Sequence, residues 1–398
     1  MTRCGAGPRR RSAAWPARAC LVAALVSAVL CAGCAQLLSI GRNAVVLGVA
    51  LDSGPGRGLT ATLQMYHHGG PTGQPGGGGG GGGTGSGGGG AAGGGGGGSP
   101  SQPVVLTLQG SGPDFAQAVE ATQGQTDVRI GFWATDLVLV GEGLARAGAR
   151  RSLDALLRDG DFSLRAEVAV VEGEAGKMLQ APQPGGSALE IGERLKHSEA
   201  TDTGSIPIPF WRFMSRLSTG YSAAWAPVLV QTPKGYRAAG TAVFRGGVLG
   251  GVLGMRRSRA LSWLLQSGGF QPLTFPASGG SGRITLDVVG RRKHLHLDGP
   301  GAGAIALTLV TRIRQGPGIS LRATPDRLAL ERAAAAAATQ ELRAALDSLQ
   351  AFGADVIGFG ALERQRDPAA VADWPAVFSR MHLTVHVTVH IHPGGRLA

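Results

Sequence analysis

Cysteine is scarce in this chain of 398 residues, and every cysteine lies near its start, at Cys4, Cys20, Cys31 and Cys34. The rest of the chain therefore has no cysteine from which a disulfide framework could form. Lysine is also rare, so the formal net charge of +12 comes mostly from arginine. These arginines are spread along the chain and accompany no known nucleic-acid-binding motif. We therefore predict no nucleic-acid partner.

Sequence signatures of catalysis are also missing. The chain contains neither the G-x-S-x-G motif of a nucleophile elbow nor the H-E-x-x-H motif of a zinc hydrolase. The stretch from Gly173 to Lys177 has some features of a phosphate-binding loop, but Met178 stands where a magnesium-binding hydroxyl is needed. We interpret this stretch as the start of a helix. The sequence therefore predicts no catalytic residues, no cofactor and no enzymatic activity.

The N-terminus has the form of an export signal. Basic residues between Arg9 and Arg18 precede an apolar run over 21–32, which is too short to span a membrane comfortably. Small residues then lead to Cys34, in an arrangement that resembles the signal in which a lipoprotein cysteine receives a diacylglyceryl group. We predict a lipoprotein signal peptide over 1–33 and lipidation of Cys34, which would anchor the chain to a membrane. An ordinary cleaved signal peptide is the alternative.

Glycine is abundant, and much of it lies in the segment 69–101. Such a segment cannot bury enough apolar surface to fold, so we predict a disordered insertion. It is either a tolerated low-complexity loop or a functional segment, namely a tether or an arm that contacts the wall. Around it, alternating strand and helix signals predict an α+β fold. We expect three domains after the signal peptide, each a mixed or antiparallel sheet packed with helices, over 34–200, 201–278 and 279–398.

Several elements can be placed from the pattern of apolar residues. Two β-branched stretches, 44–51 and 58–66, predict a hairpin, and 162–171 predicts a buried strand. Residues 284–289 and 293–297 predict two further short strands. Residues 305–314 predict another strand, and we expect these three strands to pair with the last strand and to pack on the long helix.

The C-terminal part holds the longest helix and strand signals. Thr324, Pro325 and Asp326 are typical of a helix start, and Gly353 is typical of a helix end. A short apolar segment over 355–360 and a helix carrying Trp374 and Phe378 follow. From 383 to 391, apolar residues alternate with threonine and histidine, which predicts a half-exposed strand.

This order of features resembles the C-terminal end of the Ger(x)C family of spore germination lipoproteins. The resemblance includes the long helix closing on Leu349 and Gln350, the segment Asp355 to Gly360, the helix with Trp374 and Phe378, and a last strand before Gly394. Earlier passages resemble the family as well, at Val140 to Glu142 and at Gly240 to Phe244. The segment Asp355 to Gly360 is our candidate for domain packing.

The resemblance implies a non-enzymatic, lipid-anchored C subunit of a nutrient germinant receptor, required for spore germination. It implies a place on the outer face of the spore inner membrane, with a membrane-embedded A subunit and a transporter-like B subunit as partners. Because the B subunit binds the nutrient, no direct small-molecule substrate is expected for this chain.

Two other classes of protein remain open from the residues alone. The first is a metal-dependent envelope enzyme, because imidazoles alternate along two predicted strands and could bind zinc or copper. These side chains are His294, His296, His382, His386, His390 and His392. Alternating polar residues on a half-exposed strand explain the same pattern, so we predict no metal site. The second alternative is a free-standing solute-binding lipoprotein.

Overall fold

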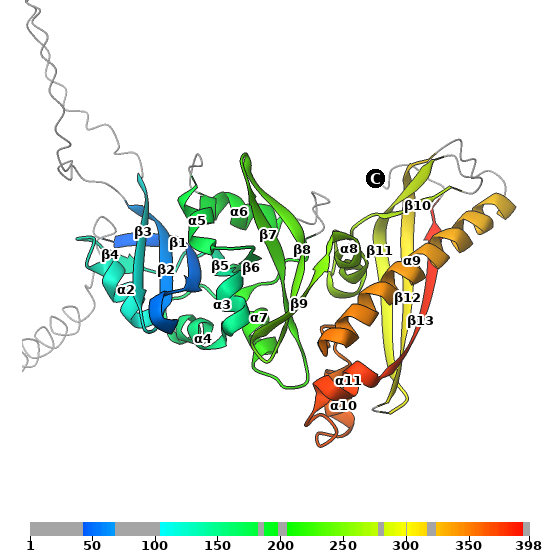
Figure 1. Ribbon diagram of the computed structural model, residues 1–398. Coiled ribbons are helices and arrows are strands. Elements are labelled where there is room, and N and C mark those ends of the chain that lie inside the picture. The colour runs from blue at the N-terminus through cyan, green and yellow to red at the C-terminus, as the bar shows by residue number, and fades with distance from the viewer. Residues whose placement is uncertain are drawn as a thin grey trace, which may run out of the picture. The chain divides into compact units, whose positions relative to one another are not determined.

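The computed structural model describes residues 43–67, 104–181, 187–197, 205–277, 282–299, 301–316 and 324–392. The predicted signal peptide, Cys34 and the glycine-rich segment 69–101 lie outside these residues. From Asn43 onward the chain forms one compact unit with two β-sheets (Figure 1).

The first sheet is mixed and runs in the order β3-β2-β1-β5-β6-β7-β8-β9, with β4 paired to β1. Its central strands β1, β5, β6 and β7 are parallel, and the strands on both flanks are antiparallel. The strands are β1 (Asn43–Ser53), β2 (Leu59–His67), β3 (Val104–Gly112), β4 (Arg129–Gly131), β5 (Leu137–Gly141), β6 (Glu167–Val171), β7 (Ala224–Thr232), β8 (Gly235–Arg245) and β9 (Val248–Gly254). A 3₁₀ turn at Pro55–Arg57 lies between β1 and β2.

Helices cover both faces of this sheet, which explains why β5 and β6 are buried along their whole length. One face packs against α5 (Ala175–Gln180) and α6 (Ser187–Lys196), and the opposite face packs against the others. Those others are α2 (Phe115–Gln123), α3 (Glu142–Ala147), α4 (Arg150–Arg158) and α7 (Phe210–Leu217). Helix α8 (Met255–Leu265) follows β9 directly.

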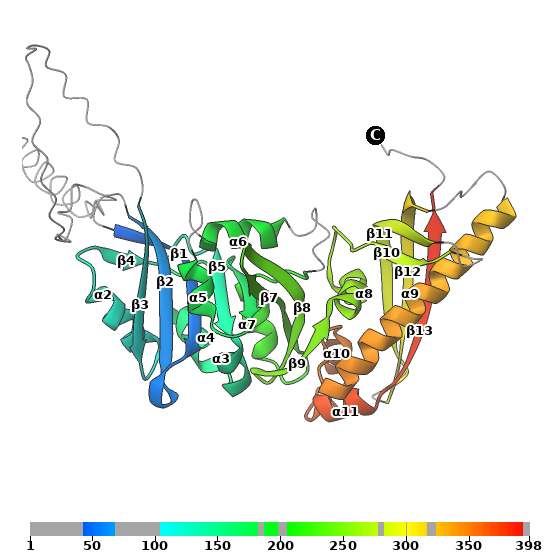
Figure 2. The same ribbon diagram turned by 45° about the horizontal axis from the view of Figure 1, so that its top comes forward.

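The second sheet has the order β10-β11-β12-β13. Its strands are β10 (Leu273–Pro276), β11 (Arg283–Leu297), β12 (Ala302–Gln315) and β13 (His382–Ile391). The first three are antiparallel, whereas β13 runs parallel to β12. The long helix α9 (Thr324–Phe352) packs across one face, and α10 (Phe359–Arg366) and α11 (Trp374–Arg380) precede β13 (Figure 2).

The expected fold class is confirmed, because sheets packed with helices make up the described chain. The hairpin, the long helix and the final strand are also confirmed, and Gly353 ends α9 with a φ of +63°. The three-domain division remains a prediction. The first sheet continues through β6 and β7, on either side of position 200, by parallel pairing.

Two predicted strand boundaries are wrong. The strand expected over 162–171 is only Glu167–Val171, because the residues before it form turns. The two strands expected at 284–289 and 293–297 are one strand, β11, whose register shifts between Val288 and Gly290. The extra residue of this β-bulge interrupts the alternation and gives the appearance of a turn.

Candidate functional site at the Asp355 segment

Cys34, the predicted lipidation site, lies outside the described residues, and its modification stays a prediction. The predicted phosphate-loop-like stretch is indeed the start of a helix. Its N-terminal N–H groups at Ala175 and Gly176 donate to the two carboxylate oxygens of Asp52, each at 2.8 Å. Burial raises the pKa of the Asp52 carboxyl, and the two backbone donors oppose this shift. A side chain of the protein itself thus occupies the position that a phosphate would take.

The histidines of β11 and β13 are separated by β12. His294 lies opposite Ala306 of β12, and Ala306 lies opposite His386, so the two imidazoles belong to strands about 10 Å apart, which is two strand spacings. His296 lies 2.9 Å from an oxygen of Asp298. Within the described ranges, no three His, Cys, Asp or Glu side chains come together as a metal site requires.

The segment that begins at Asp355 is organised around a buried carboxylate. Asp355 is only 2% exposed. One of its oxygens accepts from the backbone N–H groups of Ile357 and Gly358 at 3.0 and 2.8 Å. The other accepts from Gly360 N–H at 2.6 Å and from the indole Nε1 of Trp374 at 2.9 Å. Burial raises the pKa of this carboxyl, and the N–H donors act in the opposite direction.

Glycine is needed at two positions of this loop. Gly358 has a φ of +110°, in the region that disfavours other residues. At Gly360, a Cβ atom would lie 2.1 Å from the carbonyl oxygen of Tyr221 and 2.5 Å from Nε1 of Trp374. The two glycines therefore let the loop close around Asp355 while its backbone approaches the start of β7.

Arg216 of α7 joins this segment to the first sheet. Its Nη1 donates to the carbonyl oxygens of Ala223 and Val356, at 3.1 and 3.0 Å. Its guanidinium also lies over the ring of buried Trp225, 4.7 Å from the ring centre. Burial lowers the pKa of Arg216 to about 10, and neighbouring Arg212 contributes to the shift. A backbone bond from Ala223 N–H to the Asp355 carbonyl completes the connection.

Two further cations connect β11 with the C-terminal end of α8. Lys293 Nζ donates to the carbonyl of Leu264 at 3.0 Å, and the guanidinium of Arg291 donates to the carbonyl of Gln266. Carbonyls at the end of a helix lack partners within the helix and attract positive charge. Burial lowers the pKa of Lys293 to about 8, and the nearby arginines lower it further.

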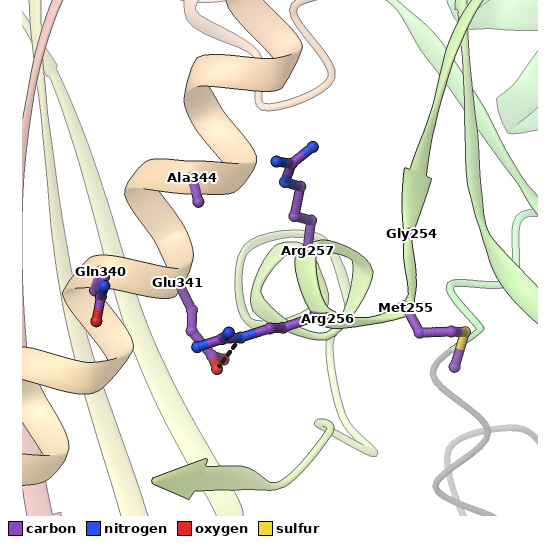
Figure 3. Close-up of a pocket in the computed structure, with 7 residues that line it drawn as sticks. All are labelled: Gly254, Met255, Arg256, Arg257, Gln340, Glu341 and Ala344. Atoms are coloured by element: carbon purple, nitrogen blue, oxygen red, sulfur yellow. Dashed lines mark hydrogen bonds and ion pairs between the residues drawn. The ribbon is translucent and has the colours of Figure 1, made fainter.

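Two cavities lie beside these connections. One, of about 550 Å³, is lined by residues before β7, by Asp355 and by the start of α11. The other, of about 430 Å³, lies between α8 and α9 (Figure 3). There Arg256 and Glu341 point toward one another and form an ion pair at 3.0 Å.

The Asp355 site is therefore structural, because its hydrogen bonds connect the segment with α7, with α11 and with the residues before β7. Both carboxylate oxygens of Asp355 accept hydrogen bonds from N–H donors, and Arg216 donates to backbone carbonyl oxygens. The sequence analysis identified the segment but missed Arg216 and Lys293. The four-residue spacing of Arg212 and Arg216 on a short apolar helix is the signal that could have identified the first.

Comparison with known proteins identifies the class. The family model described as "Spore germination protein N-terminal domain" matches residues 39–231, and "Spore germination B3/ GerAC like, C-terminal" matches residues 239–395. Together they span nearly all of the chain after the predicted signal peptide. The chain belongs to this family of spore germination proteins, as its resemblance to Ger(x)C proteins predicted.

A solved structure has a similar fold. It is described as "Crystal Structure of the GerBC protein", and it aligns with a TM-score of 0.53 over 86% of this chain and 96% of that chain. The sequence identity is 15%, so this likeness concerns the fold. No curated protein sequence matches. Among the described helices, none is long and apolar enough to cross a membrane.

Proposed function

We propose that this chain is the lipid-anchored C subunit of a nutrient germinant receptor. The observation that carries the proposal is the match of the two family models, which cover residues 39–231 and 239–395 in the family's order. In this proposal, Cys34 carries the diacylglyceryl group and holds the body at the outer face of the spore inner membrane. Two acyl chains on one cysteine give stable anchoring, which a single chain does not.

The subunit acts through contacts with the membrane-embedded A and B subunits and not through catalysis. The way the described chain uses its buried charges supports this view. The side chains of Asp52, Asp355 and Arg216 all form hydrogen bonds with backbone groups of the same molecule. Such networks give a rigid body with fixed surfaces, which suits a protein that works by binding to others.

The anchor is tested by comparing Cys34→Ala with Cys31→Leu, which restores the leucine usual at that place in the lipoprotein signal. We expect mass spectrometry to find a diacylglyceryl group on Cys34 in the parent and in Cys31→Leu. In Cys34→Ala the group is absent, the protein leaves the membrane fraction, and germination with nutrient falls severely. An unmodified Cys34 in a soluble, fully active protein would contradict the proposal.

The partners are tested separately. The A and B subunits of the receptor should co-purify with this chain from detergent-solubilised spore membranes. Isothermal titration of the isolated chain with nutrients should give no binding heat. Saturable nutrient binding by the chain alone would favour the solute-binding alternative instead.

A further inference from the structure

One edge of the second sheet has no neighbouring strand in the part of the chain that the structure describes. Strand β13 is the last in the order β10-β11-β12-β13, and it pairs with β12 in parallel. The backbone N–H groups of His382 and His392 donate toward β12. In a parallel ladder, alternate residues turn their N–H and C=O groups to the same side. The odd-numbered residues from Leu383 to Ile391 therefore present these groups to the open edge.

One of these edge groups already has a substitute partner. The N–H of Ile391 donates to the carboxylate of Glu331, a side chain of α9, at 2.8 Å. The carboxylate oxygen takes the place that a carbonyl oxygen of a neighbouring strand would have. The edge thus has the geometry to bind the backbone of an extended chain.

Helix α9 extends past this edge. The figures show its N-terminal end running beyond β13 (Figures 1 and 2). Its first buried side chain is Ala334, and Leu328 is 47% exposed. The six residues before Leu330, the first side chain that packs against the core, correspond to about 9 Å of helix. This overhang exposes apolar surface that the described chain does not cover.

Helix α9 and the edge strand enclose an open groove of about 590 Å³. On the helix side it is lined by Leu328, Glu331, Arg332 and Ala335, and on the strand side by Val387, Thr388, Val389 and His390. A groove between an edge strand and a helix is the geometry in which peptides bind by adding a strand to a sheet.

We propose that this groove binds an extended segment of a partner protein, which adds to β13 as a fifth strand. The added strand would lie about 4.8 Å beyond β13. Side chains opposite Val387 would face α9 and contact Leu328 and Ala335, so they are apolar. The intervening side chains would lie beside His386 and His390, on the exposed face of the sheet.

The charge on that exposed face points to the chemistry of the partner. It carries three arginines, Arg292, Arg312 and Arg314, which outnumber the carboxylates there: Arg312 and Arg314 share that of Asp287, and Asp298 lies beside His296. A face with an excess of positive charge is complementary to acids. The partner segment therefore alternates apolar and acidic residues. This inference depends on β13, α9 and the charges on the exposed face of the sheet, and not on receptor membership or on lipidation.

A proline substitution tests strand addition directly. Val387→Pro removes an N–H that faces the open edge and leaves the β12 ladder intact, whereas Val387→Ala loses side-chain atoms and keeps the N–H. The probe is a fluorescein-labelled peptide of alternating valine and glutamate, added to the full-length chain in detergent and followed by fluorescence anisotropy. A second peptide, N-methylated at alternate residues, lacks the backbone donors.

We expect saturable binding of the first peptide and none of the second. Val387→Pro should weaken binding by about tenfold or more, and Val387→Ala by less than about threefold. Leu328→Glu, at a half-exposed position that leaves folding unchanged, should also weaken it by about tenfold. Absence of saturable binding to the parent, or equal affinity in Val387→Pro and Val387→Ala, would overturn the proposal. So would a dimer in light scattering that Val387→Pro dissociates, since a second copy would then occupy the edge.

Discussion

At the scale of single residues, the described chain depends on buried charges that serve its own backbone. Asp355 is the clearest case, because one carboxylate satisfies donors from its own loop and from Trp374 of α11. The bond from Arg216 to Val356 extends the network to α7. Removing one partner from such a network leaves the others buried and unsatisfied, which costs more free energy than the bond itself contributes.

Asp355→Asn should lower the free energy of unfolding by roughly 3 kcal/mol. An amide keeps one acceptor oxygen, but its NH₂ group cannot accept from Gly360 or Trp374. Thermal unfolding measured by circular dichroism gives the effect. Asp347→Asn is the matched control, because Asp347 is an exposed acid on α9, and its melting temperature should equal that of the parent. Equal stability of Asp355→Asn and the control would contradict the role assigned to Asp355.

Glu167 predicts a dependence on pH. It is 8% exposed, and burial raises its pKa from 4.5 to about 7, against the opposing charge of Lys196. Between these values the folded state binds the proton that the unfolded state has released, so stability falls as pH rises and stays lower above pH 7. In Glu167→Gln this side chain has no proton to release, so the loss of stability between pH 4.5 and pH 7 disappears. At pH 8 the substitution should raise the free energy of unfolding by up to about 3 kcal/mol, and at pH 4 by little.

Urea unfolding at pH 4, 6 and 8 measures this difference. Glu172→Gln serves as the control, because Glu172 lies just after β6 and is exposed. Its stability should differ from that of the parent by the same small amount at each pH. If the stability of Glu167→Gln and of the parent changed with pH in parallel, Glu167 would be ionised at neutral pH without lowering the free energy of unfolding.

At the scale of elements, strong periodicity was enough to predict α9 and β13, because one face of each is apolar over many residues. Weak or interrupted patterns were not enough. The bulge near Gly290 divided β11 into two apparent strands, and the four-residue β10 was too short to recognise. The bonds of Asp355 could not be predicted, since its donors come from a loop backbone and from a helix nineteen residues away.

The end of α9 gives a test at this scale. Gly353 has a φ of +63°, and Ala there should destabilise the protein by about 1 to 2 kcal/mol, because a Cβ atom is disfavoured in the left-handed region. Gly254→Ala is a suitable control, since Gly254 has a φ of −63° and open space around it. Differential scanning calorimetry should show a lower melting temperature for the first variant alone.

At the scale of the whole molecule, the glycine-rich segment interrupts a hairpin. Strands β2 and β3 are antiparallel, and His67 lies opposite Val104, so the two ends of the interruption are neighbours. Replacing 69–101 with a short turn should leave the fold intact. It should stabilise the protein by roughly 1.5 kcal/mol, because a shorter loop costs less closure entropy.

Urea unfolding of this deletion variant measures the gain, and germination of spores carrying it tests for a further role. Normal germination would identify the segment as a tolerated loop. A germination defect in a variant that folds as the parent does would instead identify a tether.

The first sheet has one boundary with few paired residues, which we call the seam. Strands β6 and β7 face each other through two residue pairs, Val170 with Val228 and Val171 with Leu229, whereas β7 and β8 share a ladder of nine pairs. A mechanical load applied between β1 and the C-terminal sheet would concentrate at this seam. The first sheet would therefore separate first between β6 and β7, and the parts on either side would move relative to one another about this boundary.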